Sequence, residues 1–282
     1  MSGKRLLISL AHPDDESFGL GGLIGKYVAQ GIEVDYICGT KGDRGTIADE
    51  HLQKYGSVEA VRDAELNCAS KVLGFRQVYK LGYSDSGMRG SPFNDDPHCL
   101  IQADEQAVTG QIVGIMRETQ PQVVITFDPF GGYGHPDHIY MHHATTRAFH
   151  VASDPAQYPE FPGVYQPQKL YYMVLSRRQL RFFILLMRLR GVDPRKAGVN
   201  QDLDYVEILD NTLLPTTKID VHAYSDLWQA ASLCHASQVN PRTGIPRFLR
   251  RIVTRRQSLY RAFPAVFNGA KLERDIFEGV RF

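Results

Sequence analysis

Residues 6–16 of the chain read Leu-Leu-Ile-Ser-Leu-Ala-His-Pro-Asp-Asp-Glu. The apolar start of this stretch has the length and composition of a buried strand in a parallel sheet. Parallel α/β sheets bind ligands just beyond the carboxyl ends of their strands, where the sequence places His12 and three carboxylates. Neighbouring acids raise one another's pKa unless a cation neutralises them, and His with Asp suits zinc or another first-row metal. The alternative is an acidic turn in which Asp14 or Asp15 only caps the next helix.

A second apolar run, residues 122–127, leads into a loop of the same kind. Residues 128–138 read Asp-Pro-Phe-Gly-Gly-Tyr-Gly-His-Pro-Asp-His. Two such loops can converge on one ion, with His12, an aspartate and His138 as three ligands and a fourth position open to water. Three protein ligands plus water is the pattern of catalytic zinc, since structural zinc sites usually have four protein ligands.

Together these two motifs resemble those of the LmbE-like/PIG-L family of metal-dependent de-N-acetylases. The likeness covers roughly residues 5–240, and each motif alone would be a weak signal. It includes further short matches: Gly19, Gly21 and Gly22, Arg62-x-x-Glu65, Gly82-Tyr83-Ser84-Asp85 and His235-Ala236-Ser237-Gln238.

The resemblance implies which residues of the two motifs hold the metal and move protons. It assigns the metal to His12, Asp15 and His138, and leaves Asp14 free to take a proton from the attacking water. The family's metal is expected to be Zn²⁺, with Fe²⁺ as the alternative.

His135 is expected to donate to the oxyanion or to the leaving amine, with Asp137 orienting or charging its imidazole. Tyr133 stands between glycines that permit it to swing in as an oxyanion donor, although those glycines could serve only to shape the turn. The resemblance also implies that Arg62 and Asp85 contact sugar hydroxyls. The alternatives are a surface ion pair for Arg62 and a turn aspartate at position 85.

The expected reaction is hydrolysis of an N-acetyl group from a small molecule that contains N-acetylglucosamine, giving acetate and a free amine. One alternative is an amidase that cleaves a larger acyl amide, such as a thiol conjugate. A sugar-binding module that uses the metal without turnover is another alternative, but the carboxylate of Asp14 argues against it, because a binder needs no free base. The two motifs supply one ligand triad, which disfavours a two-metal phosphoesterase.

The composition narrows the classes of protein that fit. With 43% apolar residues among 282, the chain can bury a sizeable core, and a net charge of +1 argues against a nucleic-acid-binding protein. The apolar run before His12 is too short for a typical signal peptide, and residues 182–187 are far short of a membrane span. We therefore expect a cytoplasmic enzyme without stable membrane insertion whose partner is a small amino sugar, with homo-oligomerisation left open.

The four cysteines, Cys38, Cys68, Cys99 and Cys234, stand far apart and form no C-x-x-C pair. Such spacing predicts neither a zinc knuckle nor a dense disulfide framework. We expect reduced thiols in the core.

Alternating strand and helix patterns predict a Rossmann-like α/β fold, a three-layer sandwich with a mostly parallel sheet. One domain is expected over 1–282, with 176–200 and 241–282 as a variable wall and a C-terminal extension. Beyond the strands named above, further strands are predicted over 33–38, 78–81, 169–175, 205–209 and 218–221. Helices are predicted over 20–30, 57–73, 102–119, 137–150, 177–190 and 223–235.

Three further features lie outside the main motifs. His142, four residues after His138, is expected to be a helix-face residue rather than a ligand, and His235 to support the site. Residues 242–261 hold seven arginines interleaved with apolar residues and predict one amphipathic helix. Its basic face is either solvated or in contact with an anionic substrate group or a partner subunit.

Overall fold

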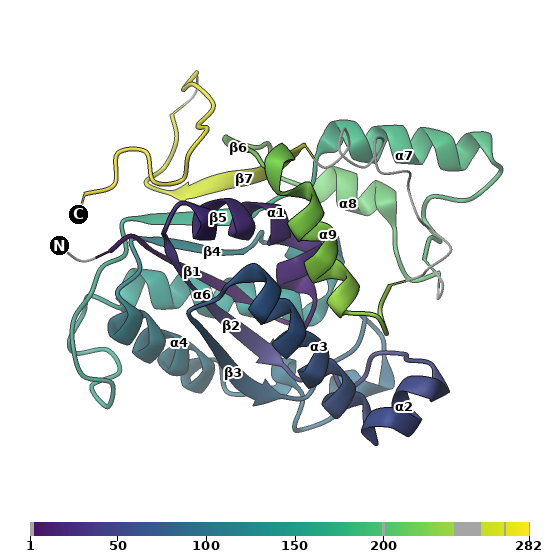
Figure 1. Ribbon diagram of the computed structural model, residues 1–282, viewed down its shortest axis with the longest axis horizontal. Helices are drawn as coiled ribbons and strands as arrows, with labels where there is room; N and C mark the ends of the chain where they lie inside the picture. Colours follow the sequence, from purple (N-terminus) through teal and green to yellow (C-terminus); the bar gives the residue numbers. More distant parts are fainter. Residues whose placement is uncertain (1–2, 199–200, 240–254, 268, 282) are drawn as a thin grey trace.

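The computed structural model describes residues 3–198, 201–239, 255–267 and 269–281. Within these residues seven strands form one sheet in the order β3-β2-β1-β4-β5-β7-β6 (Figure 1). The strands are β1 (Arg5–Leu10), β2 (Glu33–Thr40), β3 (Gln77–Tyr83), β4 (Val123–Phe127), β5 (Lys169–Met173), β6 (Thr217–Asp220) and β7 (Arg256–Phe263).

The first five strands of the chain are parallel to one another, and only β6 and β7 add antiparallel pairs. β1 lies between β2 and β4, and its residues from Leu6 to Leu10 are all fully buried. Because the chain enters parallel strands from the same side, β1 and β4 end side by side. The two predicted motifs are thereby brought together.

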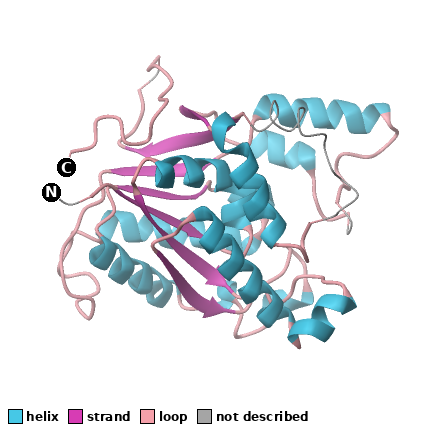
Figure 2. Ribbon diagram, viewed as in Figure 1, coloured by secondary structure: helices cyan, strands magenta, loops and turns pink. Residues whose placement is uncertain are grey.

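Helices cover both faces of the sheet, as Figure 2 shows most clearly. On one face lie α1 (Asp15–Ala29), α3 (Val58–Leu73) and α9 (Ser225–Cys234), and on the other α4 (Glu105–Thr119) and α6 (Pro136–Val151). The shorter helices are α2 (Asp49–Tyr55), α5 (Gly131–Gly134) and α8 (Tyr205–Asn211), while α7 (Arg177–Leu189) lies farther from the sheet. The predicted three-layer α/β fold with a mostly parallel sheet is confirmed.

The glycines after the first motif have a packing role. A Cβ atom on Gly21 would lie 2.7 Å from the Trp228 ring, and one on Gly25 would lie 2.7 Å from Leu227. Trp228 also donates its indole hydrogen to the Ser17 carbonyl at 2.6 Å. Glycines therefore let α9 closely approach the backbone of α1.

Two predicted elements are wrong. The segment predicted as a strand over 205–209 is the start of helix α8, because the Asp204 carboxylate accepts hydrogen bonds from the Val206 and Glu207 amides and caps it. The end of the predicted helix over 242–261 is strand β7, in which Gln257 and Leu259 alternate as buried residues between β5 and β6. Positions 240–254 of that prediction lie outside the described residues.

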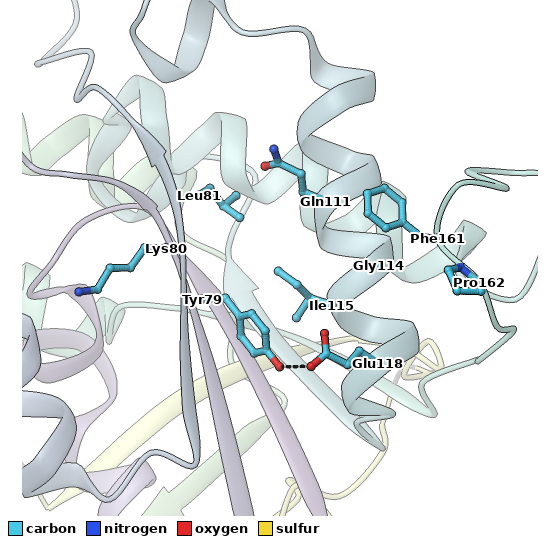
Figure 3. Close-up of a pocket in the computed structure, with 9 residues that line it drawn as sticks. All are labelled: Tyr79, Lys80, Leu81, Gln111, Gly114, Ile115, Glu118, Phe161 and Pro162. Atoms are coloured by element: carbon cyan, nitrogen blue, oxygen red, sulfur yellow. Dashed lines mark hydrogen bonds between the residues drawn. The ribbon is translucent and has the colours of Figure 1, made fainter.

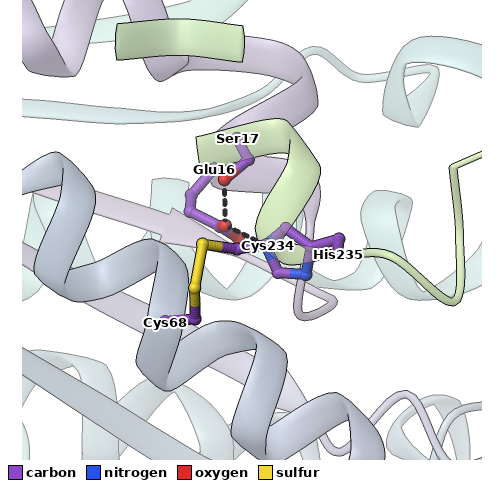
Figure 4. The surroundings of a disulfide bond; sticks show 5 residues. All are labelled: Glu16, Ser17, Cys68, Cys234 and His235. Carbon is purple, nitrogen blue, oxygen red and sulfur yellow. Dashed lines mark hydrogen bonds and ion pairs between the residues drawn. A yellow bond between two sulfur atoms is a disulfide. The ribbon is translucent and has the colours of Figure 1, made fainter. Parts of the chain in front are cut away.

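The expectation of four reduced thiols is also wrong. Cys68 on α3 and Cys234 at the end of α9 form a disulfide across 166 residues of sequence (Figure 4). The two helices pack together and bring these Cα atoms within 5.6 Å, which sequence spacing alone does not reveal. Cys38 and Cys99 are buried and unpaired, as expected.

Among the described residues, no helix combines the length and the apolar character that crossing a bilayer requires. The extent of the single domain over 1–282, with its variable segments, stays a prediction.

Candidate metal and catalytic site

Three side chains at the ends of β1 and β4 form a face with the dimensions of a metal site. His12 Nδ1 lies 3.0 Å from His138 Nε2, and Asp15 carboxylate oxygens lie 3.5 Å and 3.4 Å from these two nitrogens. A tetrahedral zinc with ligands about 2.0–2.1 Å away separates its ligand atoms by about 3.3–3.4 Å. His12 and His138 therefore lie at ligand spacing beside the Asp15 carboxylate, and His135 offers another nitrogen within 4.8 Å of both imidazoles, so the predicted ligand set stays a proposal.

The backbone around the triad fixes these side chains before any metal binds. Asp15 begins α1 and accepts a hydrogen bond from the His12 amide at 2.7 Å, which closes the turn after β1. Asp14 has a φ of 137°, in a region that non-glycine residues rarely adopt and that costs about 1–3 kcal/mol. Because of this backbone conformation, the side chains of Asp14 and Asp15 point in different directions.

His138 lies on α6, and residues of β4 and α5 hold its ring in place. Its Nδ1 faces the Gly131 carbonyl at 3.0 Å, and its ring stacks on Phe127 with centroids 3.9 Å apart. Burial lowers the pKa of His138 to about 4, so its imidazole is neutral, the form that binds a metal. The free Nε2 then points to His12 and Asp15.

The second nitrogen of His12 contacts Asp137. His12 Nε2 lies 3.1 Å from an Asp137 oxygen, whereas His135 Nδ1 lies 4.0 Å from the same oxygen. Asp137 also accepts hydrogen bonds from the Ser86 amide at 2.9 Å and from the Ser86 hydroxyl. A carboxylate on the remote nitrogen of a metal-binding histidine fixes its tautomer and ring orientation. The structure therefore places Asp137 behind His12, and it reveals Ser86, which the motifs did not single out.

Asp14 is the carboxylate that stands free of the triad. Burial, with repulsion from Asp15, raises its pKa to about 6 despite Arg62, whose Nη2 lies 2.8 Å away. Burial alone would raise the pKa of Asp15 as well, but His138 and His12 hold it well below its usual range. Two adjacent carboxylates thus differ in proton affinity.

Arg62 reaches the site from α3 and is almost fully buried. One of its nitrogens donates to Asp14 and to the Pro13 carbonyl, while its Nε and Nη1 find no partner among the described residues. Glu65, the other residue of the Arg62-x-x-Glu65 match, accepts hydrogen bonds from the amide and hydroxyl of Ser237. Buried donors without partners are costly, and a bound ligand would satisfy them.

Tyr133, His135 and Asp85 line one cavity of about 770 Å³ beside the triad. The Asp137 amide donates to His135 Nδ1 at 3.2 Å, so the ring hydrogen sits on Nε2, 3.9 Å from an Asp85 oxygen. Burial, assisted by His12, lowers the pKa of His135 to about 3, and burial raises the pKa of the Tyr133 phenol. Both groups are therefore neutral hydrogen-bond donors at neutral pH.

The family model described as GlcNAc-PI de-N-acetylase, PIG-L, matches residues 7–149. The chain belongs to the PIG-L family. A 1D-myo-inositol 2-acetamido-2-deoxy-alpha-D-glucopyranoside deacetylase of Geodermatophilus obscurus is 35% identical over 84% of this chain and 83% of its own length. The protein of that name from Rhodococcus jostii is 37% identical over 85% and 83%. The predicted family and class of enzyme, a metal-dependent de-N-acetylase that hydrolyses an amide, are thus confirmed.

Solved structures show how widely this PIG-L fold is used. N,N'-diacetylchitobiose deacetylase from Pyrococcus horikoshii matches with a TM-score of 0.58 and 21% identity, covering 85% of this chain and 72% of that one. GalB, the 4-carboxy-2-hydroxymuconate hydratase of Pseudomonas putida, matches with a TM-score of 0.59 and 21% identity over 95% and 99%. The fold alone therefore does not determine the reaction.

The buried pair Glu16 and His235 contacts the turn of the first motif. Glu16 and His235 are both fully buried and lie 2.7 Å apart, next to the Cys68–Cys234 disulfide (Figure 4). Glu16 also accepts a hydrogen bond from the Asp14 amide at 2.9 Å, which connects α9 to the strained turn. Sequence reasoning expected support from His235 but did not find Glu16 as its partner.

Two further features of the structure lie apart from the residues predicted for the site. His142 is buried and its Nδ1 contacts the Phe127 carbonyl at 2.8 Å, which fits a structural helix residue. A separate cleft of about 610 Å³ lies between β3 and α4, where the Tyr79 hydroxyl donates to Glu118 (Figure 3). It contains none of the predicted site residues.

Proposed function

We propose that the protein hydrolyses the N-acetyl group of a small N-acetylglucosaminide, with zinc as its metal and iron(II) as the alternative. The spacing of the His12, Asp15 and His138 donors beside the free carboxylate of Asp14 carries the proposal. Several curated relatives are named as deacetylases of an inositol glycoside of N-acetylglucosamine, which makes inositol the first candidate for the attached group.

A divalent metal at such a site supplies an activated water and a Lewis acid for the amide carbonyl. Asp14 would take one proton from the attacking water, since its pKa of about 6 leaves it ionised but basic near neutral pH. Oxygen from that water bonds to the carbonyl carbon, and the carbonyl oxygen gains negative charge. His135 Nε2 and the Tyr133 hydroxyl would donate to this oxygen, which suits their neutral forms.

The carbon–nitrogen bond then breaks, and Asp14 would return its proton to the leaving nitrogen. The second water proton, left on the new carboxyl group, then passes to the amine, so that acetate and the ammonium form of the amine result and atoms and charge balance. We assign the transfer that accompanies bond breaking to Asp14 rather than to His135, because the low pKa of His135 leaves its imidazole without a second proton to give. Asp137 would act through His12 by holding its ring in the ligating orientation.

The cavity offers polar partners for a sugar next to the reacting group. Asp85 presents a carboxylate at the cavity wall, and Arg62, beside Asp14, has two buried nitrogens without a partner among the described residues. We propose that both bind sugar hydroxyls. The outer wall, formed in part by Met88, Phe93 and Tyr205, leaves room for the group attached to the sugar.

A cytoplasmic location and a homo-oligomer stay proposals. The Cys68–Cys234 disulfide weighs against the reducing cytoplasm, because such bonds persist more readily in oxidising compartments.

The test is acetate release from a panel of N-acylated amino sugars by metal-stripped protein, before and after one equivalent of zinc or iron(II) is added. The panel contains the N-acetylglucosaminide of inositol, N,N'-diacetylchitobiose and an analogue with a longer acyl chain. We expect metal-dependent release of acetate, fastest with one N-acetylglucosaminide. Tight metal binding without hydrolysis of any member would contradict the proposal, and preference for the long acyl chain would favour the amidase alternative.

A further inference from the structure

Helix α7 presents an unusually apolar surface to solvent. It packs against α8 and lies at the periphery of the molecule, away from the sheet (Figure 1). Only Leu180 and Ile184 of its residues are buried. Phe182, Leu185 and Leu189 are 58%, 53% and 74% exposed, and Phe183 is exposed as well.

These exposed side chains form a stripe. At 100° per residue, Leu185, Leu189, Phe182 and Leu186 fall within an arc of about 100° on the helix. Arg177, Arg181 and Arg188 fall within a separate arc of about 40°. Arg178 falls inside the apolar arc, so the exposed face of α7 carries apolar and basic side chains together.

The charge of the segment has one sign. Residues 177–192 contain five arginines and no acidic residue. In the neighbouring α8 region, Asp204 pairs with Arg195 and Glu207 lies 3.4 Å from Arg89. An isologous contact between two copies of α7 would bring like charges together, which disfavours a second copy as the occupant of this face.

We propose that the exposed face of α7 binds the surface of an anionic lipid bilayer. Phe182, Leu185 and Leu189 would enter the boundary between headgroups and acyl chains, and the arginines would contact lipid phosphates. A helix of 13 residues is about 20 Å long, too short to span a bilayer but suited to lie in its plane. This attachment is peripheral and independent of the proposed chemistry.

Such docking would place the catalytic cavity beside the membrane. Leu203, Tyr205 and Ile208, from the segment and helix that pack near α7, line the same cavity as Tyr133 and His135. The bilayer surface would therefore lie near one wall of the cavity, without covering the metal triad itself.

Flotation of the purified full chain with lipid vesicles tests this proposal. We expect binding to vesicles of phosphatidylcholine mixed with phosphatidylglycerol, weaker binding to phosphatidylcholine alone, and loss of the difference at high salt. The Phe182→Ser/Leu189→Ser variant should bind the anionic vesicles at least about tenfold more weakly. Arg181→Gln/Arg188→Gln should remove most of the preference for anionic vesicles.

A matched control is Leu233→Ser on α9, which removes a leucine that is 56% exposed on another helix and should leave vesicle binding unchanged. An unchanged melting temperature shows that each variant folds, and Leu189→Ser alone is the milder substitute. The proposal is overturned if the wild-type chain floats with neither vesicle, or binds both equally. It is also overturned if the wild type is a dimer that the α7 variant dissociates, which would assign this face to a second copy.

Discussion

Two clusters of charged groups in the described part of the chain differ in how completely their members are paired. In the catalytic cluster, His12, Asp14, Asp15, Arg62 and His138, two carboxylates are neighbours and two arginine nitrogens lack partners among the described residues. The Glu273 cluster lies where strands β5 and β6 begin, whereas the catalytic cluster follows the carboxyl ends of β1 and β4. There one carboxylate accepts hydrogen bonds from Lys169, Tyr171, Thr217 and Arg261.

The pKa values follow this difference. In the catalytic cluster burial raises the pKa of Asp14 to about 6. In the Glu273 cluster burial would raise the pKa of the carboxyl, but its hydrogen bonds and the charge of Lys169 lower it below 4.5. A buried charge with every partner in place stabilises the fold, whereas one held near a like charge is poised for chemistry.

Asp14→Asn is the change with the largest expected effect. Asparagine keeps the size of the side chain but cannot take a proton, so kcat should fall by about 10²–10⁴-fold while zinc content and the melting temperature stay near wild type. Asp49→Asn, at an exposed position of α2, is the matched control and should retain full activity. A zinc-loaded, active Asp14→Asn enzyme would remove Asp14 as the base.

Glu273→Gln should act on stability and leave catalysis unchanged. The substitution leaves Lys169 and Arg261 without their carboxylate and should lower the free energy of unfolding by about 3 kcal/mol at pH 7. Because the folded pKa of Glu273 is lowered, its contribution is present above pH 4.5 and is lost as pH falls through the folded pKa. Urea unfolding at several pH values should show the gap between variant and wild type closing in acid. A constant gap would contradict this account.

Cys68→Ser tests how much the disulfide beside the catalytic cluster contributes to stability, since no disulfide lies in the Glu273 cluster of described residues. The disulfide closes a long loop and should contribute about 2–4 kcal/mol to stability. Reductant should lower the melting temperature of the wild type to that of the variant and leave the variant unchanged. If reductant has no effect on the wild type, the two thiols are not bonded in solution.

The parallel part of the fold and the convergence of His12, Asp15 and His138 could be predicted because their signals are local. An apolar run such as Leu6–Leu10 identifies a buried strand, and the motif that follows must lie at its carboxyl end. The disulfide could not be predicted, because Cys68 and Cys234 meet only through the packing of α3 on α9. Helix α8 was missed because the cap from Asp204 outweighs a β-rich composition.

The side chain that Asp137 contacts also could not be identified from the sequence. His12 and His135 both lie near it, and the choice between them depends on ring orientations that residue order does not encode. Sequence placed Asp137 in the site and associated it with His135, whereas the observed distances favour His12.

Asp137→Asn separates these two partners and has the smallest effect of the four changes. If Asp137 orients His12, the variant should bind zinc about 10–100-fold more weakly, as measured by competition with a chelating dye, and saturating zinc should restore most of its kcat. If Asp137 acts instead on His135, zinc affinity will be unchanged and kcat will stay low at any zinc concentration. His135→Gln is the matched comparison, because its ring lies outside the triad and its loss should lower kcat without weakening zinc binding. If zinc affinity falls in Asp137→Asn but not in His135→Gln, then Asp137 acts on the proposed metal ligand His12 and not on His135.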